Sequence, residues 1–113
     1  MNHSTRREDN ITILDLSGEV EVSQAPKLRD VLINLLEQNS GRLLVNMTDV
    51  VYIDSAGLSV LIAANRQAQK IGGGFGISNP QPTVQQVFRL TRMNQVFQIY
   101  DTVTEGITAL AAE

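Results

Sequence analysis

The chain has 113 residues, with 9 basic and 12 acidic side chains and a formal net charge of −3. This length fits one domain, and the acidic balance argues against nucleic acid as a partner, because phosphate binding requires a concentrated basic face. The sequence contains no cysteine, which excludes disulfides, thiol catalysis and cysteine-based zinc sites. No apolar run approaches the ~18 residues of a membrane span, so we expect a cytoplasmic protein without membrane insertion.

The first part of the chain passes from a strand pattern to a helix pattern. Polar residues 1–10 predict either a frayed end or a short edge strand whose charges discourage further pairing. The β-branched and apolar run 11–16 predicts a strand that ends in a turn at Ser17-Gly18. The apolar spacing then becomes helical after Ser23, a candidate N-cap, with Pro26 in the first turn.

This first helix is expected to stop near Asn39-Ser40-Gly41, a typical C-terminal signal. Two apolar runs follow, 43–47 and 50–53, and the first of them predicts a strand that is covered on both faces. An amphipathic stretch after residues 54–57 predicts a second long helix, which the glycines at 72–74 terminate.

The last third of the chain repeats the same alternation. A strand is predicted over residues 75–78, and Thr83 is a candidate cap for a third helix. Residues 96–100 have the composition of a final strand, and residues 104–112 have the pattern of a final helix that Thr104 opens.

Strands and helices therefore alternate along the chain, which predicts an α/β fold. We expect a single domain over residues 1–113, with its core between about residues 11 and 112. Its sheet should be mixed or largely parallel, with about four to five strands packed against about four α-helices.

Several kinds of chemistry find little support in the sequence. His3 is the only histidine and lies in the polar N-terminal stretch, so neither a histidine triad nor a histidine metal site is expected. The glycines at 72–74 and Gly76 follow a predicted helix instead of opening one, and they lack the spacing of phosphate-binding loops. We therefore expect no catalytic residues, no metal and no cofactor.

One segment, residues 54–58, combines several local signals. The apolar run before it and the helical pattern after it place Ser55 at a strand-to-helix junction, at or beside the N-cap, near unpaired backbone N–H groups. Gly57 has no Cβ and would let another backbone approach closely. A serine here is also explained simply as a helix cap in a turn. Four carboxylates fall near the predicted ends of strands, where α/β sheets carry their functional face: Glu19, Glu21, Asp49 and Asp54.

Phosphorylation of Ser55 would change the charge of this surface without requiring a new fold. A phosphoserine adds roughly −1.5 to −2 charges at neutral pH, and a helix N-terminus carries about +0.5 charge that accommodates it. Together with Asp54, and with Glu21 if it lies nearby, the phosphate would make the surface strongly acidic. A partner that docks there through apolar contacts or its own carboxylates would then be repelled.

The chain resembles the STAS family, and specifically its stand-alone anti-sigma factor antagonists, from about residue 11 to residue 112. The resemblance rests on residues 16–21, on residues 44–47 and on residues 51–61, which contain the element Asp-Ser-Ala-Gly-Leu. The family's C-terminal third is similar to the apolar pattern formed here by Val84, Val87, Phe88, Phe97, Ile99 and Tyr100.

The resemblance implies a bacterial regulatory protein and not an enzyme. The family's phosphoacceptor is the Ser or Thr directly after the motif Asp, which here is Ser55. The implied partner is an anti-sigma factor that is also a serine kinase with a histidine-kinase-like ATPase fold. This partner binds the protein while Ser55 is unphosphorylated, and the complex dissociates when Ser55 is phosphorylated. A PPM-class serine phosphatase would reset the switch. The implied partner-binding residues are Glu21, Asp54, Ala56, Gly57, Leu58 and Ser59.

The chain departs from the family at one position of the motif. Many members carry Ser or Thr where this chain has Ala56, which excludes a second acceptor there and leaves Ser55 intact.

Two alternative functions are a scaffold subunit and a hydrolase. STAS domains also serve as constitutive scaffold subunits of transporter or lipid-trafficking ABC assemblies, where Ser55 would act only as a cap, and fold resemblance does not select between the roles. A hydrolase with Ser55 as nucleophile lacks both a Gly-x-Ser-x-Gly element and a positioned histidine.

Overall fold

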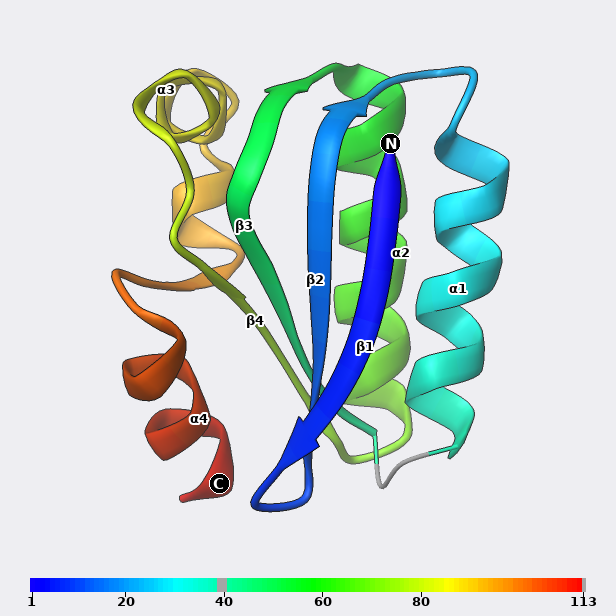
Figure 1. Cartoon of the computed structure of the whole chain (residues 1–113), viewed down its shortest axis with the longest axis vertical. Helices are drawn as coiled ribbons and strands as arrows, with labels where there is room; N and C mark the ends of the chain where they lie inside the picture. The colour runs from blue at the N-terminus through cyan, green and yellow to red at the C-terminus, as the bar shows by residue number, and fades with distance from the viewer. Residues whose placement is uncertain (39–40, 113) are drawn as a thin grey trace.

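Five strands form one sheet in the order β1-β2-β3-β4-β5 in the computed structural model, which describes residues 1–38 and 41–112. β1 pairs with β2 in antiparallel orientation, and each later pair is parallel. Helices connect the parallel strands (Figure 1). In chain order the described elements are β1 (Asn2–Glu8), β2 (Ile11–Val20), α1 (Ala25–Gln38), β3 (Arg42–Ile53), α2 (Ser55–Lys70), β4 (Gly74–Ser78), α3 (Pro82–Leu90), the 3-10 helix η1 (Met93–Gln95), β5 (Gln98–Tyr100) and α4 (Val103–Ala111).

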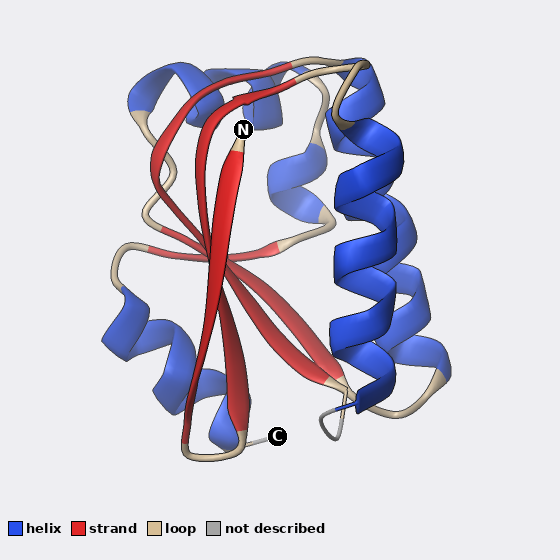
Figure 2. Ribbon diagram, turned by 45° about the vertical axis from the view of Figure 1, so that its right-hand side comes forward, coloured by secondary structure: helices blue, strands red, loops and turns tan. Residues whose placement is uncertain are grey.

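Helices cover both faces of this sheet. α1 and α2 lie side by side against one face, and α4 lies against the other (Figure 2). Val84 and Phe88 of α3 contribute to the same core as α1 and α2. The arrangement confirms the α/β class and the mixed sheet that the alternating pattern predicts. Within the described part of the chain, no helix is long and apolar enough to cross a bilayer.

Two hydrophobic cores lie on opposite faces of the sheet. Ile11 and Ile13 of β2 join Leu110 of α4 in the smaller core, whereas Leu14 and Leu16 join the larger core under α1 and α2. This division follows the alternation of side chains along a strand. Burial of each such side chain contributes roughly 1.5–3 kcal/mol, so a one-residue slip of β2 would exchange both sets and is strongly disfavoured.

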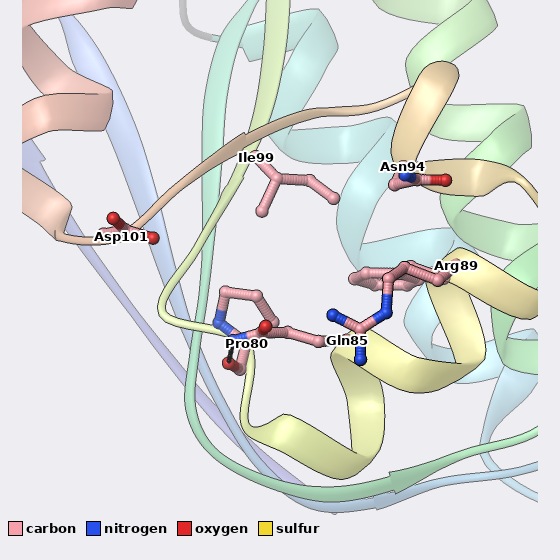
Figure 3. Close-up of a pocket in the computed structure, with 7 residues that line it drawn as sticks. Pro80, Gln85, Arg89, Asn94, Ile99 and Asp101 are labelled. Carbon is pink, nitrogen blue, oxygen red and sulfur yellow. Dashed lines mark hydrogen bonds between the residues drawn. The ribbon is translucent and has the colours of Figure 1, made fainter.

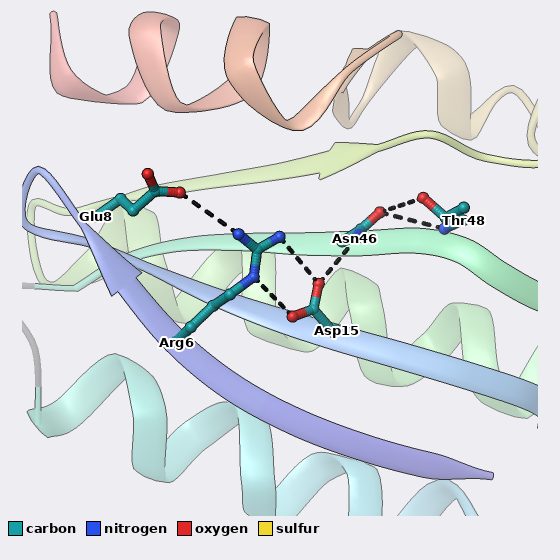
Figure 4. Close-up of polar contacts among 5 residues, drawn as sticks. All are labelled: Arg6, Glu8, Asp15, Asn46 and Thr48. Carbon is teal, nitrogen blue, oxygen red and sulfur yellow. Dashed lines mark hydrogen bonds and ion pairs between the residues drawn. The ribbon is translucent and has the colours of Figure 1, made fainter.

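β1 confirms the edge-strand alternative for the N-terminal residues. All seven of its residues are exposed, so backbone pairing with β2 and surface contacts hold it in place. The Arg6 guanidinium donates to the Asp15 carboxylate at 2.8 Å (Figure 4). Asp9 and Asn10, with φ of 51° and 66°, form the tight turn between the two strands.

β2 and β3 are both longer than predicted. The prediction of a turn at Ser17-Gly18 is wrong, because β2 continues to Val20 with two register shifts against β3. Gly18 adopts φ +85°, a conformation that suits glycine and that accounts for the turn-like sequence at this irregularity. The apolar runs 43–47 and 50–53 belong to one continuous strand, β3. Both strands consequently reach the start of α2.

α1 begins at Ala25, so the prediction of Ser23 as its N-cap is wrong. The Ser23 hydroxyl instead donates to the Glu21 carboxylate at 2.9 Å. Pro26 lies in the first turn as predicted, where its missing N–H removes no helical hydrogen bond. Of the predicted helix stop at 39–41, residues 39 and 40 lie outside the described residues, and Gly41 adopts φ +74°.

The predicted caps of the last two helices are also wrong. α3 begins at Pro82, because a proline is already shaped for the first helical position, and Thr83 therefore lies inside the first turn. α4 is capped by Thr102 in place of Thr104. The Thr102 hydroxyl accepts a hydrogen bond from the N–H of Glu105 at 3.1 Å.

The predicted strand at 75–78 is confirmed as β4, whereas the final strand is shorter than predicted. Residues 93–95 form η1, which follows Arg92 at φ +62°, and only Gln98–Tyr100 pair with β4. Phe97 turns inward instead and packs edge-on against Phe88 at a ring separation of 5.7 Å. This packing fixes the chain just before β5 begins.

Candidate functional site

Ser55 is the first residue of α2, directly after the N-cap Asp54. Its side chain is exposed, and its hydroxyl makes no hydrogen bond to any residue that the structure describes. The interpretation of Ser55 as the helix cap is therefore wrong, and the expected position beside the cap is confirmed. An exposed hydroxyl without a structural task is accessible to a modifying enzyme.

Asp54 carries out the capping and also joins two segments of the chain. Its Oδ1 accepts the N–H of Gly57 at 2.9 Å, and its Oδ2 accepts the N–H of Val22 at 2.9 Å. The backbone N–H of Asp54 donates to the carbonyl of Val20 at 3.2 Å. A single residue therefore fixes the start of α2 against the end of β2 and the loop that follows it.

The first turn of α2 contains both bonded and unbonded backbone N–H groups. Asp54 uses the N–H of Gly57 through its side chain and the N–H of Leu58 through its carbonyl, at 3.0 Å. Among the described residues, the N–H groups of Ser55 and Ala56 have no acceptor. Such N–H groups at a helix start attract negative charge. They lie on the residue that carries the exposed hydroxyl and on the next one.

Gly57 permits the close approach that its lack of a side chain predicts. A Cβ at this position would lie 2.7 Å from the carbonyl oxygen of Val20 and 2.9 Å from side-chain carbons of Val20 and Ile53. Contacts below 3.0 Å are essentially absent from real structures, so α2 can start this close to the ends of β2 and β3 only with glycine here. In Figure 1 these strand ends and the start of α2 lie at one end of the sheet.

The loop between β2 and α1 borders the site. Val22 is 68% exposed although its N–H is bound to Asp54. Glu21, which is half-buried, accepts the Ser23 hydroxyl. Tyr52, two residues before Asp54, is 49% exposed. The exposed Val22 and the carboxylate of Glu21 are therefore joined to the start of α2 through the bond from Val22 to Asp54.

The remaining candidate residues of α2 divide into two groups by burial. Gly57 and Leu58 are buried, Leu58 with an exposed fraction of 7%, so they support the site from below its surface. Ala56 is half-buried and Ser59 is exposed. The Ser59 hydroxyl donates to the carbonyl of Ser55 at 2.9 Å, a local bond within the helix.

One of the four candidate carboxylates does not lie at a strand end. Asp49 is inside β3, where its register partner is Ser17, because the strand continues past it to Ile53. Glu19 is the penultimate residue of β2, opposite Tyr52, and therefore lies at a strand end as predicted. Glu21 and Asp54 are the two that the structure places at the start of α2, through the loop that contains Val22.

A polar network that the sequence patterns did not predict lies on the sheet. Asp15 accepts hydrogen bonds from Arg6 and, at 2.8 Å, from the Asn46 amide (Figure 4). The Asn46 oxygen in turn accepts the Thr48 hydroxyl at 2.7 Å. The Arg6 hydrogen bond holds the pKa of Asp15 below its ordinary value, and the Asn46 bond adds to this, against the opposing effect of burial. The network stabilises β1 on the edge of the sheet.

Comparison with known proteins identifies the family. The STAS domain family matches residues 2–106, and the chain belongs to this family. It is 29% identical over 99 residues to the anti-sigma-B factor antagonist of Bacillus subtilis, covering 88% of this chain and 90% of that relative. The resemblance noted in the sequence is thus confirmed at the level of family.

Solved structures share the fold at lower identity. The unphosphorylated form of the anti-sigma factor antagonist SpoIIAA superimposes with a TM-score of 0.82 at 18% identity, covering 99% of this chain and 98% of that one. The phosphorylated form of this Bacillus protein gives a TM-score of 0.71. The murine anion transporter Slc26a9 contains a similar region, with a TM-score of 0.80 at 15% identity, but the match covers only 19% of that chain.

Proposed function

We propose that this protein is an anti-sigma factor antagonist whose binding to its partner is switched by phosphorylation of Ser55. The observation that carries the proposal is the exposed Ser55 hydroxyl, free of hydrogen bonds to the described residues, at the start of a helix already capped by Asp54. Because the cap does not use Ser55, the hydroxyl can be esterified without loss of the helix start. The relative in Bacillus subtilis is an anti-sigma-B factor antagonist, which supports the same role here.

The proposed partner is an anti-sigma factor that is also a serine kinase with a histidine-kinase-like ATPase fold. In the transfer step, the Ser55 Oγ attacks the γ-phosphorus of ATP, a new Oγ–P bond forms, and the bond to the ADP oxygen breaks. The hydroxyl proton leaves to a base on the kinase. A PPM-class phosphatase then restores the hydroxyl by hydrolysis, with release of inorganic phosphate. The protein itself supplies the acceptor and no catalytic residue.

The start of α2 offers backbone groups that would accept the phosphate. The N–H groups of Ser55 and Ala56 lack acceptors among the described residues, and they lie at the positive end of α2. SpoIIAA, which shares this fold, has a known phosphorylated form. The phosphate would add roughly −1.5 to −2 charges beside the carboxylate of Asp54. We infer that the partner is repelled by this charge at the contact surface, with the scaffold unchanged.

The partner-binding surface would comprise Ser55 and its exposed neighbours. Val22 and Tyr52 supply apolar surface, and Glu21 and Ser59 supply polar groups. A phosphate in the middle of an apolar contact must be desolvated when the partner docks, and that is costly. Buried Gly57 and Leu58 would act by shaping the start of α2.

A phosphorylation assay tests the proposal. The purified protein is incubated with ATP and the anti-sigma factor kinase of its own source organism, and its intact mass is measured. One phosphoryl group should be added, and Ser55→Ala should abolish the addition. Ser59→Ala is the matched control, because Ser59 is exposed one turn further along α2, and it should be phosphorylated like the wild type. Modification at another residue, or none, would refute the proposal.

The alternative role is that of a constitutive scaffold subunit of a transporter or lipid-trafficking ABC assembly. This role uses the same fold but does not require phosphorylation of Ser55. The region of Slc26a9 that resembles the chain shows that the fold also occurs within a transporter. In that role Ser55 would serve only as a cap, but Asp54 is the cap. Stable co-purification with a permease and no modification of Ser55 would favour the scaffold.

A further inference from the structure

A hollow of about 270 Å³ lies at the carboxyl ends of β4 and β5, beside α3 and η1 (Figure 3). In open α/β sheets, ligands bind outside the carboxyl ends of the strands. The volume suits a ligand smaller than a drug-sized molecule. The residues that line the hollow are Pro80, Gln85, Phe88, Arg89, Asn94, Ile99 and Asp101. None of them belongs to the surface around Ser55.

Two opposite charges line this hollow without pairing. Arg89 projects from α3, and Asp101 follows β5 on the other side of the hollow (Figure 3). Neither forms an ion pair or a side-chain hydrogen bond with the described residues, and they do not pair with each other. By contrast, Arg6 and Asp15 on the sheet do pair. A ligand with one negative and one positive group would match both charges at once.

The hollow also has a fixed apolar side. Phe88 is fully buried and supports this side from beneath through its edge-on contact with the Phe97 ring, and Ile99, which is half-buried, is the apolar side chain that a ligand can reach. The Gln85 amide donates to the Pro80 carbonyl at 2.8 Å, which fixes the wall between α3 and the end of β4. A fixed wall with a few precisely placed polar groups is a feature of small-molecule sites.

The end of β4 retains unused polar atoms next to this wall. The two residues before Pro80 are Ser78 and Asn79, and their side-chain oxygens are buried. Neither oxygen has a hydrogen-bond partner within the described part of the chain. Buried polar groups are normally paired, and Thr12 in β2 has an unpaired buried side-chain oxygen as well, so the feature is not confined to this end of the sheet.

We propose that the hollow binds a small zwitterion, an α-amino acid with an apolar side chain. Its carboxylate would pair with the Arg89 guanidinium, which suits carboxylates through two parallel hydrogen bonds. Its ammonium group would pair with Asp101, and its side chain would lie on Ile99. A simple anion would be repelled by Asp101 and a simple cation by Arg89, whereas an uncharged apolar molecule would leave both charges unmatched.

Titration with L-leucine, followed by NMR of the backbone amides, tests this inference. Leucine should cause saturable shifts confined to residues 80–101. L-Leucinamide lacks the carboxylate and N-acetyl-L-leucine lacks the ammonium group, so each should bind about tenfold more weakly or worse. Arg89→Gln and Asp101→Asn should each weaken leucine binding to a similar extent. Both residues are exposed, so the variants should keep the wild-type fold, which the same spectra report.

Arg92→Gln is the matched control, because Arg92 is an exposed arginine near the hollow that does not line it, and it should bind leucine like the wild type. Three results would overturn the inference. The first is the absence of saturable shifts up to about 10 mM leucine, a concentration about ten times the dissociation constant of a weak ligand, roughly 1 mM. The others are equal binding of the two blocked derivatives and unaltered leucine binding by the Arg89 and Asp101 variants. Ser55→Ala should leave leucine binding unchanged, so this result is independent of the proposed phosphorylation.

Discussion

The carboxylate of Asp54 accepts the backbone N–H of Val22 at 2.9 Å, across 32 positions of the sequence. Because the other carboxylate oxygen caps α2 through Gly57, the two bonds tie the β2–α1 loop to the residue that precedes Ser55. The shape of the surface around Ser55 therefore depends on one side chain. This relationship makes the site testable by substitution.

Replacement of Asp54 should separate its two structural tasks. Asp54→Ala removes the cap and leaves the Val22 N–H unpaired, and we expect it to lower the free energy of unfolding by about 2 kcal/mol. Asp54→Asn keeps one acceptor oxygen for the cap and should cost about 1 kcal/mol. Urea denaturation of the two variants and the wild type measures both values. Equal losses for the two variants would contradict the double role.

Gly57→Ala should destabilise the protein, although alanine is normally the better helix former by about 1 kcal/mol. The new Cβ would lie 2.7 Å from the Val20 carbonyl oxygen, and backbone must move to relieve the contact. We expect a net loss of about 1–3 kcal/mol in unfolding free energy. Ala63→Gly, elsewhere in α2, measures the propensity term alone and should cost about 1 kcal/mol. A stabilised Gly57→Ala variant would contradict the close approach.

The Asp15 carboxylate should make the free energy of unfolding depend on pH. Its pKa is lowered in the folded protein, chiefly by the hydrogen bond from Arg6, so the unfolded chain binds its proton more readily. The stabilisation is present above the ordinary Asp pKa of about 4 and is lost as the pH falls through the lower, folded value. Asp15→Asn should therefore cost about 0.5–1 kcal/mol at pH 7.

The difference between Asp15→Asn and the wild type should shrink toward zero in acid, once the wild-type carboxylate is protonated as well. Denaturation curves at a series of pH values between neutral and strongly acidic provide the measurement. A gap that stays constant over this range would mean that the charge of Asp15 contributes nothing.

Val22 should matter for the partner and not for the fold. Its side chain is 68% exposed, so Val22→Asp should change unfolding free energy by less than about 0.5 kcal/mol. The added carboxylate would enter the proposed apolar contact and should weaken binding of the anti-sigma factor about tenfold. Leu90→Asp is the control, since Leu90 is 77% exposed on α3, and it should bind as the wild type does. Calorimetric titration of each variant with the anti-sigma factor measures the two affinities.

Most elements of the fold could be predicted from the sequence because their signals are local. The leucines at 28, 32 and 36 repeat at helical spacing and are buried in α1. The alternation in β2 predicts a strand, although not its extension past Gly18, where a register shift replaces the expected turn. Helix caps were predicted poorly, because Ser23 and Thr83 have the right chemistry in the wrong place.

The candidate site was predictable in part. Ser55, Asp54 and Gly57 are adjacent in the sequence, so the pattern of a strand followed by a helix places them at one junction. The contribution of Val22 was not predictable, because its bond to Asp54 depends on the register between β2 and β3, including both shifts. No local signal in the sequence encodes that alignment.

The affinity of the anti-sigma factor kinase for protein carrying phosphoserine at position 55 tests the central claim most directly. Phosphoserine is introduced at this position during synthesis, and the modified and unmodified proteins are titrated against the same partner. We predict tight binding by the unmodified protein and a loss of about 100-fold or more on phosphorylation, which corresponds to roughly 3 kcal/mol. Equal affinities of the two forms would contradict the proposal that the charge on Ser55 controls the partner.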